Sequence, residues 1–377
     1  MRVIRGLHNL PEAPEGCVAT IGNFDGVHRG HQAILDQLRE RAAKLGLPVT
    51  VVVFEPQPRE YFAGDQAPPR LTRLRDKARL LAECGADQVL CLPFNEALRS
   101  LTARQFIERI LVAGLGVRHL VVGDDFRFGR ERDGDFSLLA QLGEECGFGV
   151  EHTRTFQLDD ERVSSSRVRT LLASGNFAQA ARMLGRPYRL AGRVIVDRQL
   201  GRTIGTPTAN VPLLPQPLAL RGVYAVVTEL PDGRCLPGVA NIGWRPTVGS
   251  TRPVLEVHLF DVNEDLYGQR LRVYPCARLR GEITFDGLEP LKRQIQVDQA
   301  RARDYFARHG STATPDDSEA RQGIAGPADA PACSTAPAAA FYTLPLTALP
   351  LASAPLAREA ATSDSSVGPA PTDQDDG

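Results

Sequence analysis

Over residues 1 to about 185, short apolar runs alternate with longer segments in which apolar residues recur every three or four positions. The short runs predict strands at 17–21, 48–54, 88–93 and 119–123. The longer segments predict helices at 31–45, 74–84, 103–113 and 136–146. Such alternation indicates an α/β domain whose mostly parallel sheet is covered on both faces. Ligands of such sheets bind beyond the carboxyl ends of the strands.

The pattern changes near residue 186. Short apolar segments separated by turn residues predict strands at 189–197, 222–228, 236–241, 254–260 and 270–276. Several strands at this spacing are typical of an antiparallel barrel or sandwich. A closing amphipathic helix is predicted over 288–306, with Leu291, Ile295 and Tyr305 as buried positions.

From about residue 311 the chain is rich in Ala, Pro, Ser, Thr and Asp. Small and proline residues bury too little surface to offset the entropy of ordering, so we expect a disordered tail. The predicted division is therefore a first domain over 1–185, a second over 186–310 and a tail over 311–377.

Composition narrows the class of protein. The chain has 44 Lys and Arg against 45 Asp and Glu, which gives no reason to expect a nucleic-acid or membrane-surface binder. Its seven cysteines form no CxxC pair, so neither a disulfide framework nor a structural zinc site is expected. The chain shows no secretory signal and no apolar stretch long enough to cross a bilayer, and we expect a cytoplasmic protein.

A glycine-rich turn follows the first predicted strand. It runs from Gly22 to His31 and includes Gly26, Gly30 and the imidazole of His28. The glycines let a nucleotide approach the backbone, and the start of the next helix offers free N–H groups to phosphate. The histidines can donate hydrogen bonds to phosphates as charge builds during group transfer. Taken alone, the same histidines could simply cap the helix.

Three further segments accompany this turn. They are 55–59 after the second strand, the loop 123–129, and the stretch 163–169, whose serines precede a helix predicted at 167–173. Ser164, Ser165 and Ser166 could act as N-caps, or with Arg167 as a phosphate clamp.

The second half carries its own polar motif. Gly201 and Gly205 allow tight turns, and Thr208 and Asn210 point to one side if the segment is extended. A hydroxyl and an amide oxygen suit Mg²⁺ beside phosphates, although a surface turn would use the same residues. Glu256 shares one face of its predicted strand with Val254, His258 and Phe260, where it could be a solvated carboxylate or a general base.

These motifs, in this order, make residues 1–310 similar to the bacterial bifunctional riboflavin kinase/FAD synthetase family. The stretches 21–31 and 164–169 resemble the signatures of its Rossmann-like nucleotidyltransferase domain. The stretches 201–210 and 254–260 resemble those of its six-stranded antiparallel riboflavin kinase barrel. Further similar segments are 221–224, 238–243 and 265–268.

The resemblance implies two reactions and their residues. The first domain would transfer AMP from ATP to FMN, giving FAD and pyrophosphate, with His28, His31 and Arg167 neutralising the leaving group beside Mg²⁺. ATP and FMN would be held by Gly22, Asn23, Phe24, Asp25, Gly26, Gly30, Asp125, Ser164, Ser165 and Ser166. The second domain would phosphorylate riboflavin to FMN, with Glu256 as base and Thr208 and Asn210 on the metal. Gly192, Gly201 and Arg202 would bind its nucleotide.

Three positions depart from the family pattern. Gln57 stands where histidine is frequent, Thr206 where phenylalanine is usual, and Trp244 where a smaller residue is common. An enzyme that keeps only the kinase activity, and a flavin-sensing protein without chemistry, remain alternatives. Small molecules are the expected partners, and self-association is left open.

Overall fold

The computed structural model describes residues 1–310 with the exception of 13, 124, 155, 197–200, 202–204, 215 and 248–249. The predicted disordered tail at 311–377 lies outside the described residues, and so does Arg202.

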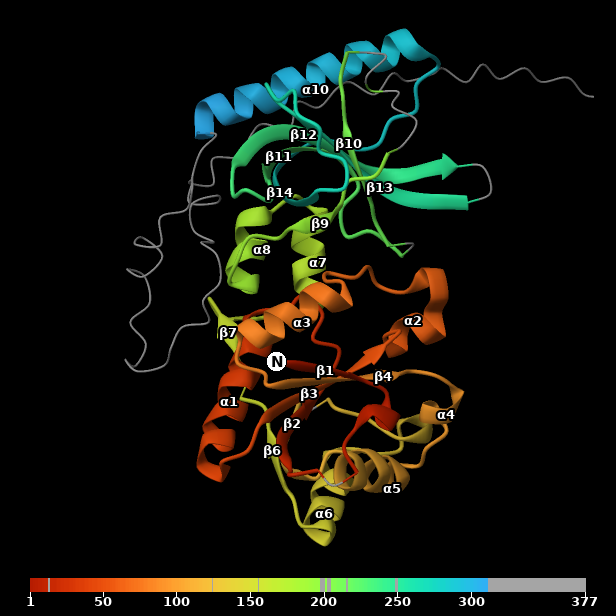
Figure 1. The fold of residues 1–377 in the computed structure, drawn as a ribbon, viewed down its shortest axis with the longest axis vertical. Helices are drawn as coiled ribbons and strands as arrows, with labels where there is room; N and C mark the ends of the chain where they lie inside the picture. Colours follow the sequence, from red (N-terminus) through yellow and green to blue (C-terminus); the bar gives the residue numbers. More distant parts are fainter. Residues whose placement is uncertain are drawn as a thin grey trace, which may run out of the picture. The chain divides into compact units, whose positions relative to one another are not determined.

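The first sheet has six parallel strands in the order β1-β4-β3-β2-β5-β6 (Figure 1). Its strands are β1 (Arg2–Arg5), β2 (Cys17–Ile21), β3 (Val49–Glu55), β4 (Gln88–Pro93), β5 (Val117–Val122) and β6 (Gly149–His152). The four apolar runs of the sequence form the interior strands and are therefore confirmed within two residues. The two edge strands, β1 and β6, were not predicted because polar residues interrupt their apolar pattern.

Helices cover both faces of this sheet. One face packs on α1 (Arg29–Leu45) and α3 (Leu74–Glu83). The other packs on α5 (Ala103–Phe106), the π-type turns of η3 (Ile107–Gly114) and α6 (Phe136–Cys146). Short elements connect them, namely η1 (Leu7–Asn9), α2 (Pro58–Ala63), η2 (Gly64–Gln66), α4 (Glu96–Arg99), η4 (Arg130–Arg132), β7 (Gln157–Leu158) and β8 (Glu161–Arg162). The doubly covered parallel sheet expected from the sequence is confirmed.

Two helices follow the sheet, α7 (Ser165–Ala173) and α8 (Phe177–Leu184). The sequence predicted α7 but not α8. Their apolar faces share one hydrophobic core with the barrel that comes next, because Leu172, Phe177 and Met183 cluster with Val211, Tyr224 and other barrel residues. Figure 1 shows both helices beside the barrel.

The second sheet is antiparallel, in the order β10-β13-β12-β11-β14-β9. Its strands are β9 (Leu190–Arg193), β10 (Ala209–Pro212), β11 (Gly222–Glu229), β12 (Cys235–Thr247), β13 (Ser250–Leu259) and β14 (Arg270–Arg280). An isolated antiparallel bridge between Ile195 and Asn210 brings the two outer strands together, so the sheet is a nearly closed barrel. The six-stranded barrel is thereby confirmed, and β10 is the strand that the apolar pattern did not predict.

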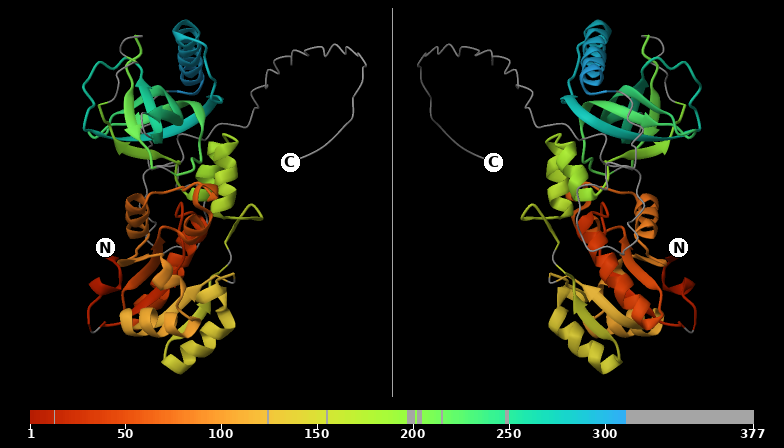
Figure 2. Two further views of the ribbon diagram at one scale, coloured as in Figure 1. Left: turned by 90° about the vertical axis from the view of Figure 1, so that its right-hand side faces the viewer. Right: turned by 90° about the vertical axis from the view of Figure 1, so that its left-hand side faces the viewer.

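A long helix, α10 (Leu288–His309), packs on the outside of the barrel through Ala302 and Phe306 (Figure 2). The prediction that Leu291, Ile295 and Tyr305 are buried is corrected, since each is only half-buried. Asp298 is buried instead, because Arg280 Nε donates to its carboxylate at 2.9 and 3.1 Å. Within the described residues, no helix is both long enough and apolar enough to cross a membrane.

Candidate functional site

A cavity of about 1130 Å³ opens beyond the carboxyl ends of β2, β3 and β5. Its volume exceeds what a drug-sized ligand needs. The glycine-rich turn and the serine stretch, far apart in the sequence, both line it. The lining includes Gly22, Asn23, Phe24, Asp25, His28, Gly30, His31, Asp125, Ser164, Ser165 and Ser166. Eleven of the sequence-predicted site residues therefore come together in one place.

The two histidines stand at the start of α1. Their rings stack with centroids 3.6 Å apart, and Nδ1 of His28, the N-cap residue, accepts from the backbone N–H of His31 at 3.3 Å. An accepting Nδ1 leaves the proton of a neutral ring on Nε2. Burial lowers the pKa of His28 to about 4 and holds the pKa of His31 well below its usual value. Both imidazoles are thus neutral near pH 7, and each can donate only one hydrogen bond to a phosphate.

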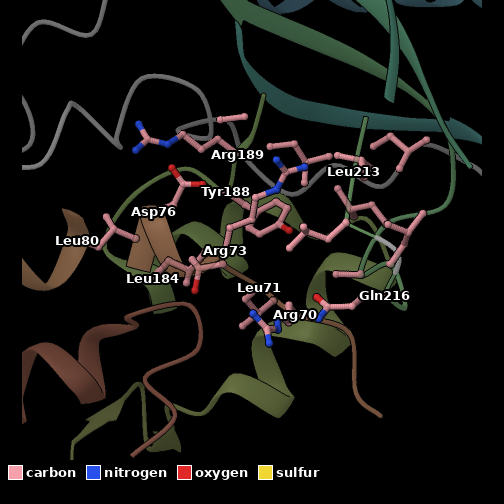
Figure 3. Close-up of a pocket in the computed structure, with 18 of the residues that line it drawn as sticks. Arg70, Leu71, Arg73, Asp76, Leu80, Leu184, Tyr188, Arg189, Leu213 and Gln216 are labelled. Atoms are coloured by element: carbon pink, nitrogen blue, oxygen red, sulfur yellow. The ribbon is translucent and has the colours of Figure 1, made fainter. Parts of the chain in front are cut away.

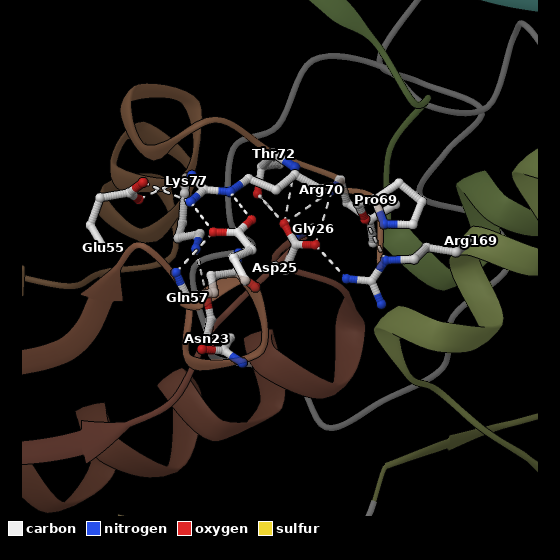
Figure 4. Close-up of polar contacts among 12 residues, drawn as sticks. Asn23, Asp25, Gly26, Glu55, Gln57, Pro69, Arg70, Thr72, Lys77 and Arg169 are labelled. Carbon is white, nitrogen blue, oxygen red and sulfur yellow. Dashed lines mark hydrogen bonds and ion pairs between the residues drawn. The ribbon is translucent and has the colours of Figure 1, made fainter. Parts of the chain in front are cut away.

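Asp25 lies in the turn but its carboxylate is engaged by the protein (Figure 4). It is 2% exposed and accepts from the backbone N–H groups of Leu71 and Thr72 at 2.9–3.1 Å. Arg169 Nη2 donates to it at 2.6 Å. The Asp25 side chain therefore holds the glycine-rich turn against Leu71, Thr72 and Arg169. Its predicted contact with a ligand would need these hydrogen bonds to rearrange.

A second group of charges fixes the neighbouring backbone. Lys77 is 1% exposed, and its Nζ donates to the carbonyl of Asn23 at 2.6 Å. Burial lowers the pKa of Lys77. Arg70 forms ion pairs with Glu55 at 2.6 Å and with Glu60. Figure 4 shows this cluster on the other side of Gly26 from Arg169. Sequence reasoning missed Lys77 because nothing local links α3 to the turn.

The serine stretch combines capping with contact to the turn. Ser164 caps α7 by accepting from the Arg167 N–H at 3.2 Å, and Ser165 Oγ donates to the Asp25 carbonyl at 2.8 Å. Arg167 does not line the cavity, since its Nε pairs with Glu161 at 2.5 Å. Arg169, two residues later, does line it. Positions two apart lie on opposite sides of a helix, which explains why only one of them faces the cavity.

Aromatic rings and an amide complete the wall. Phe54, Phe62 and Phe94 line the cavity, with the rings of Phe62 and Phe94 5.7 Å apart. Gln57, where the family often has histidine, is 6% exposed, and its Nε2 is buried without a hydrogen-bond partner among the described residues. An apolar wall of rings packed edge to face, beside an unpaired donor, suits an aromatic ring system with polar edges.

The barrel brings three polar residues onto one rung. Asn210 of β10 pairs in register with Glu256 of β13, which pairs in turn with Asn241 of β12. Directly opposed residues present their side chains on the same face, and Asn241 Nδ2 donates to Glu256 at 3.2 Å. Leu255 and Val257 face the core, so the predicted alternation along this strand is confirmed.

Asn210 is the unusual member of this rung. It is 6% exposed, yet its Oδ1 is buried and accepts no hydrogen bond from any described residue. A buried acceptor without a donor is costly, and a cation or a ligand donor would relieve that cost. Thr208, half-buried, lies two residues away. Among the described residues no three His, Cys, Asp or Glu side chains gather as a metal site.

The predicted glycines stand close to this segment. A Cβ on Gly192 would lie 2.3 Å from Cγ1 of Val211, and one on Gly201 would lie 2.3 Å from the Thr206 carbonyl. Gly26, in the first domain, has φ +86°, and a Cβ on it would lie 2.8 Å from the Leu71 side chain.

Two positions that depart from the family pattern also lie in the barrel domain. Thr206 Oγ1 accepts a hydrogen bond from Gln299 at 3.3 Å, and Trp244 is half-buried in β12.

A smaller cavity of about 90 Å³ is lined by Arg70–Arg73, Tyr188 and Gln216, among others (Figure 3). It is much smaller than a nucleotide pocket, and none of the sequence-predicted site residues lines it. The large cavity and the Asn210 rung contain sequence-predicted residues and are the two candidate sites.

Comparison with known proteins matches the two halves of the chain to two different family models. A family model described as FAD synthetase matches residues 10–167, and one described as riboflavin kinase matches residues 184–306. The chain is 54% identical over 307 residues to the bifunctional riboflavin kinase/FMN adenylyltransferase of Escherichia coli (strain K12), covering 81% of this chain and 98% of that protein. It is 56% identical over 304 residues to the protein of the same name from Pseudomonas fluorescens, covering 80% and 97%.

A solved structure supports the shared architecture. The crystal structure of a macrolide-efflux protein from Streptococcus pneumoniae aligns with a TM-score of 0.67 and 27% identity, and covers 81% of this chain and 99% of that one. The resemblance read from the motifs is confirmed by the two family matches and by the identity to curated relatives. The chain belongs to the family of bifunctional riboflavin kinase/FMN adenylyltransferases.

Proposed function

We propose that the chain phosphorylates riboflavin to FMN with ATP and then adenylylates FMN to FAD with release of pyrophosphate. The observation that carries the proposal is the presence of two separate polar sites, each built from the motifs of one matched family. The large cavity joins the residues of the transferase match, and the Asn210–Glu256 rung lies within the kinase match.

In the first site, we assign adenylyl transfer to direct attack. The FMN phosphate oxygen bonds to the α-phosphorus of ATP as the bond to the pyrophosphate oxygen breaks, so no protein nucleophile is needed. The first turn of α1 offers unpaired N–H groups to the phosphates. His28 and His31 donate as neutral imidazoles to oxygens that gain charge. Arg167 could assist only if its side chain leaves Glu161.

The flavin has a matching wall. Phe54, Phe62 and Phe94 offer faces and edges on which an isoalloxazine ring can pack, and Gln57 Nε2 can donate to one of its polar edge atoms. Asn23, Asp125 and the three serines then surround the phosphates of the two substrates.

In the second site, we assign Glu256 as the base that accepts the proton of the riboflavin 5′-hydroxyl as that oxygen bonds to the γ-phosphorus of ATP and ADP leaves. Asn241 orients this carboxylate through its 3.2 Å hydrogen bond. Asn210 Oδ1 and the Thr208 hydroxyl fit Mg²⁺, because one is a buried acceptor without a partner and both are hard oxygen ligands. When bound, the metal would neutralise charge on the transferring phosphoryl group.

Because both reactions consume ATP, we place the protein in the cytoplasm.

The test uses the full chain with riboflavin, ATP and Mg²⁺, and separates the flavins by chromatography over time. FMN should appear first and FAD should follow. Accumulation of FMN without FAD would leave only the kinase, and unchanged riboflavin that stays bound would favour a flavin sensor.

Two variants assign the sites. Glu256→Gln should abolish FMN formation but still convert supplied FMN to FAD, and His31→Ala should do the reverse. Glu264→Gln and His309→Ala, which change exposed residues of the same types, serve as matched controls and should keep both activities. Equal loss of both activities in either site variant would contradict the assignment.

A further inference from the structure

Arg186 lies two residues beyond the end of α8, yet its guanidinium reaches the glycine-rich turn. Nη2 donates to the Gly26 carbonyl at 2.5 Å, and Nη1 donates to the Val27 and Leu184 carbonyls at 3.1 Å each. Arg186 stands outside the FAD synthetase match, which ends at residue 167, and inside the riboflavin kinase match, which begins at residue 184. It therefore links the turn of one site to a segment assigned by sequence to the other.

The turn needs such support because its backbone is strained. Val27 has φ +41°, although β-branched residues rarely adopt the left-handed region. Phe24, at φ +47°, is a second side-chain-bearing residue there. Residues held in such regions are strained and persist only when surrounding contacts fix them. Val27 is fully buried, and Gln32 Nε2 joins Arg186 in donating to its carbonyl at 3.0 Å.

The contact also sets the direction of a donor. In a trans peptide the C=O of one residue and the N–H of the next point in opposite directions. Because the Val27 carbonyl is directed to Arg186 and Gln32, the N–H of His28 is directed away from them. His28 is the N-cap of α1 and lines the large cavity. The carbonyl contact thus fixes the orientation of the peptide at which the phosphate-facing helix begins.

The neighbouring packing is tight enough to hold this geometry. Gly185 caps α8 with φ +73°, and a Cβ there would lie 3.2 Å from Gln32 Oε1 and 3.4 Å from the Arg29 side chain. Gln32 Nε2 also donates to the Leu184 carbonyl at 2.9 Å. The end of α8 therefore packs directly against the first turn of α1, and this packing fixes the position of Arg186.

We propose that Arg186 is a positioning residue for adenylyl transfer, which holds the Gly26–Val27 carbonyls so that the start of α1 keeps its phosphate-binding orientation. This inference rests on the proposed FMN adenylyltransferase activity. It means that the transferase site is completed by a residue beyond its own family match.

The experiment measures both activities of the full chain in Arg186→Met and Arg186→Lys. Arg186→Met should lower kcat for FAD formation from FMN by at least tenfold while changing the KM for FMN less than threefold, because the turn and not the flavin wall is disturbed. FMN formation should stay within twofold of the unchanged chain. Arg186→Lys, which can still donate to one carbonyl, should recover at least a third of the lost kcat.

Arg308→Met, which removes an exposed arginine near the end of α10, is the matched control and should leave both activities unchanged. FAD formation within twofold of normal in Arg186→Met, a parallel loss of both activities, or no recovery with lysine would each overturn the inference. If the unchanged chain makes no FAD from FMN, the proposed function fails instead, so the two failures are distinguishable.

Discussion

Replacing Asp25 with asparagine tests whether the glycine-rich turn is held by a buried charge. The side chain keeps its shape but loses the charge that faces Arg169, whose side chain is only 15% exposed. An amide nitrogen would also face at least one of the donors that now converge on the carboxylate from Leu71, Thr72 and Arg169. The variant therefore leaves a buried cation without its partner.

The expected cost follows from these contacts. Removing one member of a buried ion pair costs about 3–5 kcal/mol. Arg169 keeps its bond to the Pro69 carbonyl at 2.6 Å, so we expect the lower end, about 3 kcal/mol of unfolding free energy. Because Asp25 supports the turn, FAD formation should fall at least tenfold, whereas FMN formation should stay within twofold.

The assay is urea unfolding of the full chain followed by helical circular dichroism, with both activities measured in parallel. Arg169→Met and the double variant complete a double-mutant cycle, and the two changes together should cost at least 1.5 kcal/mol less than their sum. A loss below about 1 kcal/mol in Asp25→Asn, or additive losses in the double variant, would refute the buried-pair reasoning.

Three further predictions concern other residues. Burial depresses the pKa of His28 from 6.5 to about 4, so the unfolded chain binds more protons than the folded chain as the pH falls below 6.5. The free energy of unfolding should therefore fall by about 2 kcal/mol from this group between pH 7 and pH 5. Urea titrations of His28→Gln should lack that part of the pH dependence. Asn210→Leu should abolish FMN formation while leaving the melting temperature equal or higher, since it removes a buried unpaired oxygen; a lower melting temperature would count against that view. Gly192→Ala should destabilise the barrel by about 1–3 kcal/mol through contact with Val211, and Val211→Ala in the same chain should restore part of the loss.

Local patterns were sufficient for much of the fold. The runs at Cys17–Ile21 and Gln88–Pro93 are strands with the predicted bounds, and α6 has the predicted bounds as well. The local spacing of apolar residues is sufficient to determine the type and the bounds of these elements. The helix predicted over 103–113 instead widens into π-type turns after Phe106, a change that side-chain periodicity does not encode.

Residues whose roles depend on distant partners could not be found in this way. Asp25 is engaged by groups 46 and 144 positions away, and Lys77 contacts a carbonyl 54 positions away. The choice between Arg167 and Arg169 was, by contrast, open to helical geometry, because Arg169 lies one turn from Ser165, which contacts the glycine-rich turn. The buried face of α10 was predicted from apolar residues alone. It therefore omitted Asp298, whose buried carboxylate is paired with Arg280 and accepts a hydrogen bond from Gln294.

The hydrophobic core that α7 and α8 share with the barrel has a consequence for any attempt to exchange modules between relatives. Leu172, Phe177 and Met183 belong by sequence to the N-terminal half but bury their side chains with Val211 and Tyr224. A fragment cut at residue 185 would leave that surface in water, and a chimera joined there would have to match two sets of side chains at once. The unit to exchange intact is therefore the pair of catalytic modules together with the two helices between them.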